Sequence, residues 1–303
     1  MKRFIKSLCL IGSIFSLSAC ESYGPEIKAE DANKMLIKFA DTKEPNAYST
    51  NVKINSNAKS VSKIPGIEAT TKTKINATVS KSKKDIYLYE KIYGTISVNF
   101  SGADVVQDIY EESWIYYRGK DFYEVTNTLN ENGTRVKECT KTEMSLLDAQ
   151  SEFATYIDTA LGEAISVLGI DFGEVQTFDS MLASAYASMT SEITYDEKDT
   201  KTTFNQKYYS KGETNLTAII SQKSKYTNPV KGNEDDFKYF KYDMSFKQSF
   251  DGAFCSNESF KYTFEKAKFN CYKSKITASY AQETKEECQL NYPDLTGYAI
   301  KLS

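Results

Sequence analysis

The chain has 303 residues, of which 40% are hydrophobic and 26% are charged, enough for one substantial hydrophobic core or two small ones. Aromatic residues make up 13% of it and there are only 5 prolines, so the composition excludes a disordered or low-complexity protein. The chain has no histidine, which excludes any reaction or metal site that depends on an imidazole.

The first 19 residues have the pattern of an export signal. Three cations precede a short apolar stretch, which is typical of a signal peptide and too short for a stable membrane span. The stretch ends at residues 17–20 in Leu-Ser-Ala-Cys, which resembles the lipobox of bacterial lipoproteins. The resemblance implies cleavage between Ala19 and Cys20 and acylation of the Cys20 thiol, with chains such as palmitate. We expect a lipoprotein signal peptide up to residue 19, followed by a tether over residues 20–28.

The first part of the body reads as a helix followed by strands. A helix is predicted over residues 31–42, where apolar residues recur every three or four positions after Asp31 as the N-cap. From there to about residue 140, apolar and polar residues alternate, which is typical of strands that bury one face. Turn signals such as Asn132-Gly133 favour an antiparallel meander. The clearest segments are residues 48–54, 71–80, 86–89, 95–100, 109–117 and 122–129.

The middle of the chain returns to a helical period. A helix is predicted over residues 142–168, nearly 40 Å long at about 1.5 Å per residue, with Thr142 and Ser145 as candidate caps. A second helix is predicted over residues 179–189, and residues 224–235 read as a polar loop. The strand pattern returns in residues 193–195, 202–209, 214–221, 237–250, 260–264, 269–280 and 298–302. In the clearest of these strands one face carries Phe240, Tyr242, Met244 and Phe246.

This order of elements predicts an α+β fold. We expect a strongly curved antiparallel sheet, a half-barrel, wrapped around a long central helix, with a further helix at the N-terminus. Long twisted strands tend to curl, and neither run of strands has enough apolar surface without the middle helices. Residues 29–303 are therefore expected to form a single domain.

A known architecture combines these features. The lipobox, the leading helix and the helices inserted between two runs of strands resemble bacterial lipoproteins of the LolA/LppX type. The segment from Trp114 to Glu124 is similar to a hairpin that such proteins often show. The resemblance covers about residues 29–302 and implies a half-barrel that holds acyl chains or another apolar ligand between sheet and helices.

Charge and hydropathy restrict the partners. The leader carries three cations and no acid, which leaves 35 basic and 41 acidic residues in the mature chain. Its lysines are scattered singly, so nucleic acid is not an expected partner. No other segment approaches 18 apolar residues, so the expected membrane contact is the lipid on Cys20. This places the protein on the outer face of the bacterial cytoplasmic membrane, or on the outer membrane where the envelope has two.

Four cysteines follow Cys20. An even number in an exported chain fits two disulfides with three alternative pairings, and four reduced thiols are the alternative. There is no Cys-x-x-Cys pair and no histidine, so neither a zinc site nor any other metal or cofactor is expected. The four candidates are Cys139, Cys255, Cys271 and Cys288.

No motif points to catalysis. Two Ser-x-x-Lys matches, at residues 60–63 and 80–83, have no Ser-Asp-Asn or Lys-Thr-Gly partner. Paired carboxylates read as solvated faces, and no glycine-rich phosphate loop occurs. We predict no enzyme and no catalytic residue.

The sequence therefore predicts a membrane-anchored, non-catalytic binding module for an apolar or lipid-like ligand. The alternative is an envelope structural or interaction lipoprotein with a fully packed core. The many tyrosines read as sheet core with cross-strand pairs, or as a groove for a sugar ring or lipid headgroup. The predicted ligand cavity is lined by Phe153, Ile157, Leu161, Ile165, Trp114 and Tyr116.

Overall fold

The computed structural model describes most of the chain between Tyr23 and Leu302. The described residues are 23–40, 49–64, 67–82, 85–166, 200–228, 236–251, 255–269, 272–285 and 290–302. The leader, the predicted second helix and the predicted strand at 193–195 lie outside them.

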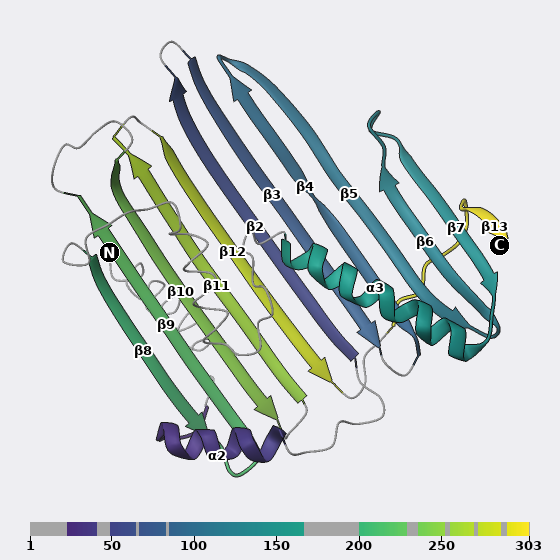
Figure 1. Cartoon of the computed structure of the whole chain (residues 1–303), viewed down its shortest axis with the longest axis horizontal. Coiled ribbons are helices and arrows are strands. Elements are labelled where there is room, and N and C mark those ends of the chain that lie inside the picture. Colours follow the sequence, from purple (N-terminus) through teal and green to yellow (C-terminus); the bar gives the residue numbers. More distant parts are fainter. Residues whose placement is uncertain are drawn as a thin grey trace, which may run out of the picture.

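The described strands form one wide sheet of 13 strands, in the order β1-β8-β9-β10-β11-β12-β2-β3-β4-β5-β6-β7-β13 (Figure 1). Every neighbouring pair is antiparallel except β13, which lies parallel to β7. The first half of the chain contributes β1 (Glu26–Ile27), β2 (Ser49–Ile64), β3 (Ile67–Ser82), β4 (Tyr87–Phe100), β5 (Ala103–Arg118), β6 (Asp121–Leu129) and β7 (Arg135–Glu143). The second half contributes β8 (Thr200–Ser210), β9 (Asn215–Thr227), β10 (Phe237–Asp251), β11 (Cys255–Lys268), β12 (Lys273–Lys285) and β13 (Ala299–Leu302).

Local sequence accounts for most of the strands. The predicted alternation is clearest in β10 and is absent from β5, and most strands run longer than expected: β4 is continuous where two segments were predicted, and β9 extends into the predicted loop. Gly119, with a φ of 74°, occupies the two-residue turn between β5 and β6, and Gly133, also at 74°, lies in the β6–β7 hairpin. Glycine adopts this left-handed conformation without a steric penalty.

The two halves of the chain meet in the middle of the sheet. β12 pairs with β2 along their length, from Lys273 opposite Val61 to Lys285 opposite Ser49. At one edge, Glu26 and Ile27, expected in the tether, pair with β8. At the other edge, β13 pairs with β7.

Two helices accompany the sheet in the described residues. α2 (Ala29–Ala40) begins two residues before its predicted start and packs against β8. α3 (Leu146–Ser166) begins after the cap at Ser145, whose hydroxyl accepts the Asp148 amide at 3.2 Å and donates to the Asp148 carboxylate at 2.6 Å. The hydroxyl of Ser145 thus caps the helix N-terminus by accepting the Asp148 amide, and the helix starts four residues after Thr142.

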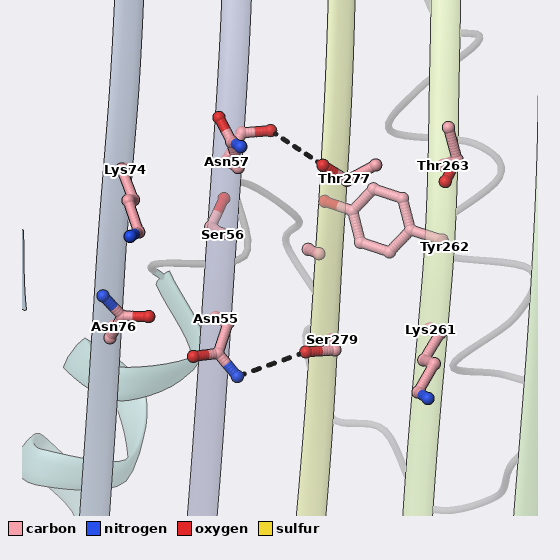
Figure 2. A pocket seen from close by; sticks show the side chains of 11 residues that line it. Asn55, Ser56, Asn57, Lys74, Asn76, Lys261, Tyr262, Thr263, Thr277 and Ser279 are labelled. Atoms are coloured by element: carbon pink, nitrogen blue, oxygen red, sulfur yellow. Dashed lines mark hydrogen bonds between the residues drawn. The ribbon is translucent and has the colours of Figure 1, made fainter.

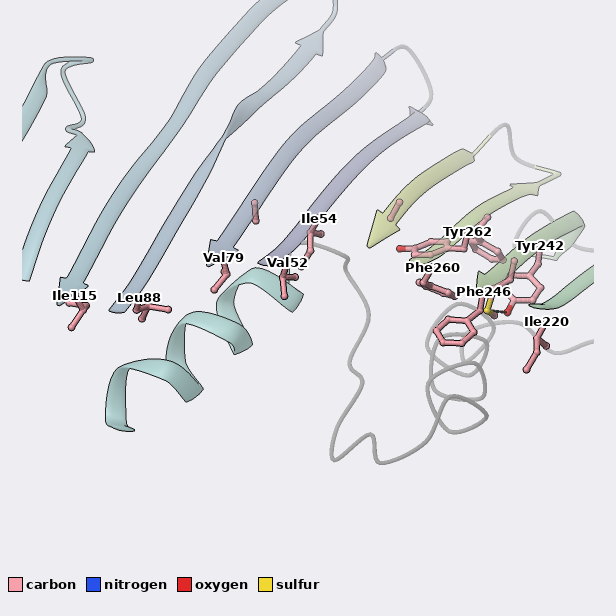
Figure 3. Packing of buried hydrophobic residues seen from close by; sticks show 14 of the residues in the cluster. Val52, Ile54, Val79, Leu88, Ile115, Ile220, Tyr242, Phe246, Phe260 and Tyr262 are labelled. Atoms are coloured by element: carbon pink, nitrogen blue, oxygen red, sulfur yellow. Dashed lines mark hydrogen bonds between the residues drawn. The ribbon is translucent and has the colours of Figure 1, made fainter. Parts of the chain in front are cut away.

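The main core lies on the face of the sheet that α3 covers, which we call the inner face. Phe153 and Ala149 of α3 are buried against it, and the rings of Phe122 and Tyr156 lie 6.4 Å apart. Figure 3 shows the inner-face side chains of both halves of the sheet pointing to the side on which α3 lies. They include Val52, Ile54, Val79, Leu88, Ile115, Ile220, Tyr242, Phe246, Phe260 and Tyr262.

The predicted α+β half-barrel around a central helix is wrong, and with it the LolA-like architecture. The structure is a broad, almost entirely β sheet with β1 and β13 at opposite edges. Thirteen strands about 4.8 Å apart span about 58 Å, whereas the 21 residues of α3 reach only about 32 Å. α3 therefore crosses only part of the sheet, packing mainly on β3, β4 and β5 with a further ring contact to Phe122 of β6, and cannot act as the centre of the fold. None of the described helices is long and apolar enough to cross a membrane.

Candidate functional site

The candidate site is the face of the sheet turned away from α3, which we call the outer face. Because side chains alternate along a strand, every second residue of the core strands points to this side. In β10 the alternation is strict: Tyr242, Met244 and Phe246 are buried, whereas Asp243 and Ser245 are exposed. The outer face is consequently polar over β8 to β12, β2 and β3.

A row of basic side chains crosses this face. Cross-strand pairing places Lys59 directly opposite Lys72 on one side and Lys275 on the other. On the far side of β11, Lys241 is opposite Lys225 in the same way. The complete lysine row, over seven adjacent strands, is Lys201, Lys225, Lys241, Glu265, Lys275, Lys59 and Lys72. Like charges directly opposite one another destabilise a sheet, so this arrangement does not serve stability.

A first groove of about 330 Å³ runs beside the lysine row (Figure 2). Its walls are amides and hydroxyls from β2, β3, β11 and β12. The Asn55 amide donates to the Ser279 hydroxyl at 3.3 Å, and the Thr277 hydroxyl donates to the Asn57 carbonyl at 3.3 Å. Lys74 and Lys261 line its two sides. The groove is shallow, and its lining residues include two lysines and several amides and hydroxyls.

A second groove of about 410 Å³ continues the first, because both are lined by Lys74 and Asn76. It is lined further by Tyr93, Gly94, Thr95, Asp108, Ile109, Tyr110, Leu129 and Arg135. A Cβ atom on Gly94 would lie 2.0 Å from the carbonyl oxygen of Lys74, so the close approach of β3 and β4 here requires glycine. Together the two grooves make a trough from β11 to β7.

A hydrogen-bonded carboxylate holds one end of the trough. Glu112 accepts the hydroxyls of Tyr110 at 2.5 Å and Tyr89 at 3.0 Å, and Lys91 lies 3.5 Å away. Burial by itself raises the pKa of Glu112, but these hydrogen bonds and the Lys91 charge outweigh it and lower the pKa below the ordinary value. Glu112 is therefore ionised, and its carboxylate fixes the hydroxyls of both tyrosines by hydrogen bonds.

The same network positions the only arginine of the trough. The guanidinium carbon of Arg135 lies 3.2 Å from the ring centre of Tyr110, and its Nη1 donates to the Asn127 side chain at 3.4 Å. Asn127 in turn donates to Glu112 at 3.3 Å. Arg135 is thus held in place before any ligand arrives, and a guanidinium matches carboxylate and phosphate geometry.

Next to the trough, the outer face carries an aromatic cluster that the C-terminal segment covers. Tyr87 and Trp114 both donate to the carbonyl of Asn291, at 2.7 and 3.1 Å. The ring of Tyr292 packs edge-on against Tyr87 and Tyr116. Burial raises the pKa of Tyr87 and of Tyr116 to about 12. The buried members of the aromatic cluster are Tyr87, Trp114, Tyr116, Val125 and Cys139.

The structure does not bring the predicted cavity residues together. Phe153 is buried on the inner face, whereas Trp114 and Tyr116 lie on the outer face within the aromatic cluster. Ile157, Leu161 and Ile165 are in α3, and their side chains lie outside the described residues. Sheet and helix are in direct contact over the described part of α3.

The remaining predicted site residues are mostly undescribed. Ala19, Cys20, Cys271 and Cys288 lie outside the described residues, and Cys255 is in β11 with its side chain undescribed. Cys139 is a free, buried thiol, so the structure gives it no disulfide. Burial raises the pKa of Cys139 despite the nearby Lys141, which makes this thiol unreactive. Within the described residues, no three acidic or cysteine side chains group as metal ligands.

Sequence reasoning missed both the lysine row and the trough. The alternating lysines were visible on single strands and were interpreted as a solvated face. Their alignment depends on the pairing of β12 with β2, which joins residues more than 200 positions apart. The tyrosine-rich segments were noticed, with a groove as one interpretation, and Tyr93 and Tyr110 do line one.

Comparisons with known proteins give no family. No family model and no curated protein matches the chain. Solved structures that align with it include a bacterial polysaccharide outer membrane secretin (5% identity, 80% of this chain and 99% of that one, TM-score 0.17). Others are the translocator domain of the autotransporter NalP from Neisseria meningitidis (6%, 84% and 95%, TM-score 0.18) and the NanC porin (4%, 74% and 98%, TM-score 0.16). At these scores the alignments carry no argument about fold or function.

Proposed function

We propose that the protein is an exported, lipid-anchored component of the cell envelope that acts without catalysis, as a binding surface. The anchor is the acylated Cys20, and the binding surface is the outer face of the sheet. The observation that supports this best is the contrast on that face: its apolar part is covered by the C-terminal segment, whereas its polar trough is open.

The proposal favours an interaction protein over a carrier of apolar ligands. Phe153 and Ala149 fill the space between α3 and the sheet, with exposed fractions of 7% and 0%. A carrier needs that space for its ligand. That a ligand binds beside Ile157, Leu161 and Ile165 remains a prediction from the sequence.

The anchor is tested by labelling cells with an alkynyl palmitate analogue. We expect the wild-type chain to be labelled and to sediment with membranes, and Cys20→Ala to lose both properties. Cys9→Ala is the matched control, because Cys9 lies in the leader and should leave labelling unchanged. Equal labelling of the wild type and Cys20→Ala would overturn the anchor.

Exposure of the outer face is tested on intact cells with a membrane-impermeant amine reagent. We expect modification of Lys59, Lys72 and Lys275, which are exposed on that face. In cells with two membranes the outer membrane is permeabilised first, and a chain whose lysines then react only after lysis of the cytoplasmic membrane would contradict export.

A further inference from the structure

The stability of the fold does not explain the lysine row. Lys59, Lys72 and Lys275 are exposed, and the part of the chain that the structure describes provides none of them with an ion pair. Glu265 is the only acid in the row, and its carboxylate accepts the Tyr239 hydroxyl at 2.7 Å. A chain of net charge −3 thus concentrates positive charge on one face.

The row and the trough form one continuous surface. Lys74 lies two residues after Lys72 on β3, and therefore on the same face, and lines both grooves. The trough adds asparagine amides, the fixed Arg135, and the ring of Tyr93, which is 44% exposed. Charge, amide hydrogen bonds and a partly exposed aromatic ring are thus available side by side.

We propose that this surface binds a linear acidic polysaccharide. This inference rests on the proposed function and names the ligand class of the same face. The carboxylates of the polysaccharide pair with the lysine row and with Arg135, and a sugar ring packs on Tyr93. Seven strands about 4.8 Å apart give the row a length of about 29 Å, which fits an extended chain of several sugar units.

Two other polyanions fit this surface less well. A membrane surface would be contacted by apolar side chains among the cations, and the lysine row contains none. Single-stranded nucleic acid is bound by successive aromatic platforms. In the trough Tyr93 offers a single partly exposed ring, because Arg135 covers Tyr110.

The test uses the detergent-purified, full-length mature protein, immobilised and exposed to polygalacturonate, with neutral dextran as the uncharged polymer. We expect binding of polygalacturonate that weakens with salt and no binding of dextran. The triple variant Lys59→Gln/Lys72→Gln/Lys275→Gln should bind at least about tenfold more weakly. The matched control is Lys28→Gln/Lys34→Gln/Lys211→Gln, which removes the same charge outside the outer face and should stay within about twofold.

The contribution of the sugar ring is tested separately with Tyr93→Ala. This variant should lose several-fold in affinity for polygalacturonate and none for inorganic polyphosphate, which has no ring to pack. Equal losses for both polymers, or for neither, would overturn the polysaccharide assignment. So would tighter binding of oligothymidylate, or of phosphatidylglycerol vesicles, than of polygalacturonate.

Failure here is distinguishable from failure of the proposed function. A protein that is palmitoylated on Cys20 and labelled on intact cells, yet binds no polygalacturonate, would refute the ligand class and leave the anchored surface protein in place. Absence of palmitoylation on Cys20 would refute the anchor, whether or not the protein binds polygalacturonate.

Discussion

Two regions of the outer face lie on neighbouring strands of one sheet, and they differ in whether another segment of the chain covers them. At one end of β4 to β7 the outward residues include Tyr87, Trp114 and Tyr116, and the segment from Leu290 to Tyr298 covers them. Over β11, β12, β2 and β3 the outward residues are mostly lysine, serine, threonine and asparagine, and several of them line the open trough. Both regions belong to one continuous sheet, and they differ in their side chains and in the segment that covers one of them.

The largest effect is expected when the covered side of the sheet is damaged. Phe240 is 0% exposed and stacks on Tyr226 with ring centres 5.4 Å apart. Phe240→Ala should lower the free energy of unfolding by about 3–5 kcal/mol, measured by urea denaturation. Ser245→Ala, on the outer face of the same strand, should change it by less than about 0.5 kcal/mol. Similar losses for both variants would contradict the assignment of the two faces.

A smaller effect is expected from loosening the cover over the aromatic cluster. Tyr292→Ala removes the ring that packs on Tyr87 and Tyr116, and should cost about 1–2 kcal/mol of stability. Trp114 is the only tryptophan and is 8% exposed, so its fluorescence reports on this cover directly. We expect its emission to shift to longer wavelength in Tyr292→Ala. Phe204→Ala, an exposed aromatic residue on β8, should leave the emission unchanged, and an unshifted Tyr292→Ala would show that the segment does not cover Trp114.

The smallest effect concerns the carboxylate at the boundary of the two regions. Because the pKa of Glu112 is lowered on folding, its contribution to stability is complete above the ordinary pKa of 4.5 and is lost as the pH falls through the lower value. Glu112→Gln should cost about 1 kcal/mol at pH 7 and flatten the decline of stability below pH 4.5. Glu111→Gln, an exposed neighbour on the inner face, is the control. An unchanged acid profile in Glu112→Gln would show that the hydrogen bonds to Glu112 do not lower its pKa.

The sequence was sufficient to predict the individual strands but not their order in the sheet. Alternation predicted the buried face of β10, with Tyr242 and Phe246 on it, because each strand carries its own pattern. Which strand lies beside which depends on distant pairing, and the placement of β12 against β2 has no local signal. The curved half-barrel was inferred from a long helix, but α3 reaches across only part of the 13-stranded sheet.

The candidate site was harder to predict for the same reason. Lys59 and Lys275 look like ordinary solvated lysines until β12 is paired with β2, and only then do they stand opposite one another. Tyr93 and Tyr110 were noticed as part of an aromatic surplus, since tyrosines are conspicuous in composition. Their role as groove walls required the cross-strand register that places Tyr93 beside Tyr110.

The pairing of β2 with β12 also has a consequence for biogenesis. β12 follows β2 by more than 200 residues, so at about 5–20 residues per second it leaves the ribosome about 10–45 s later. During that interval β2 presents an unpaired strand edge to every other nascent chain. Charged side chains are a common protection of such edges against aggregation, and Lys53 and Lys59 lie on this one. Until β12 pairs with β2, these lysines disfavour the pairing of this edge with strands of other chains.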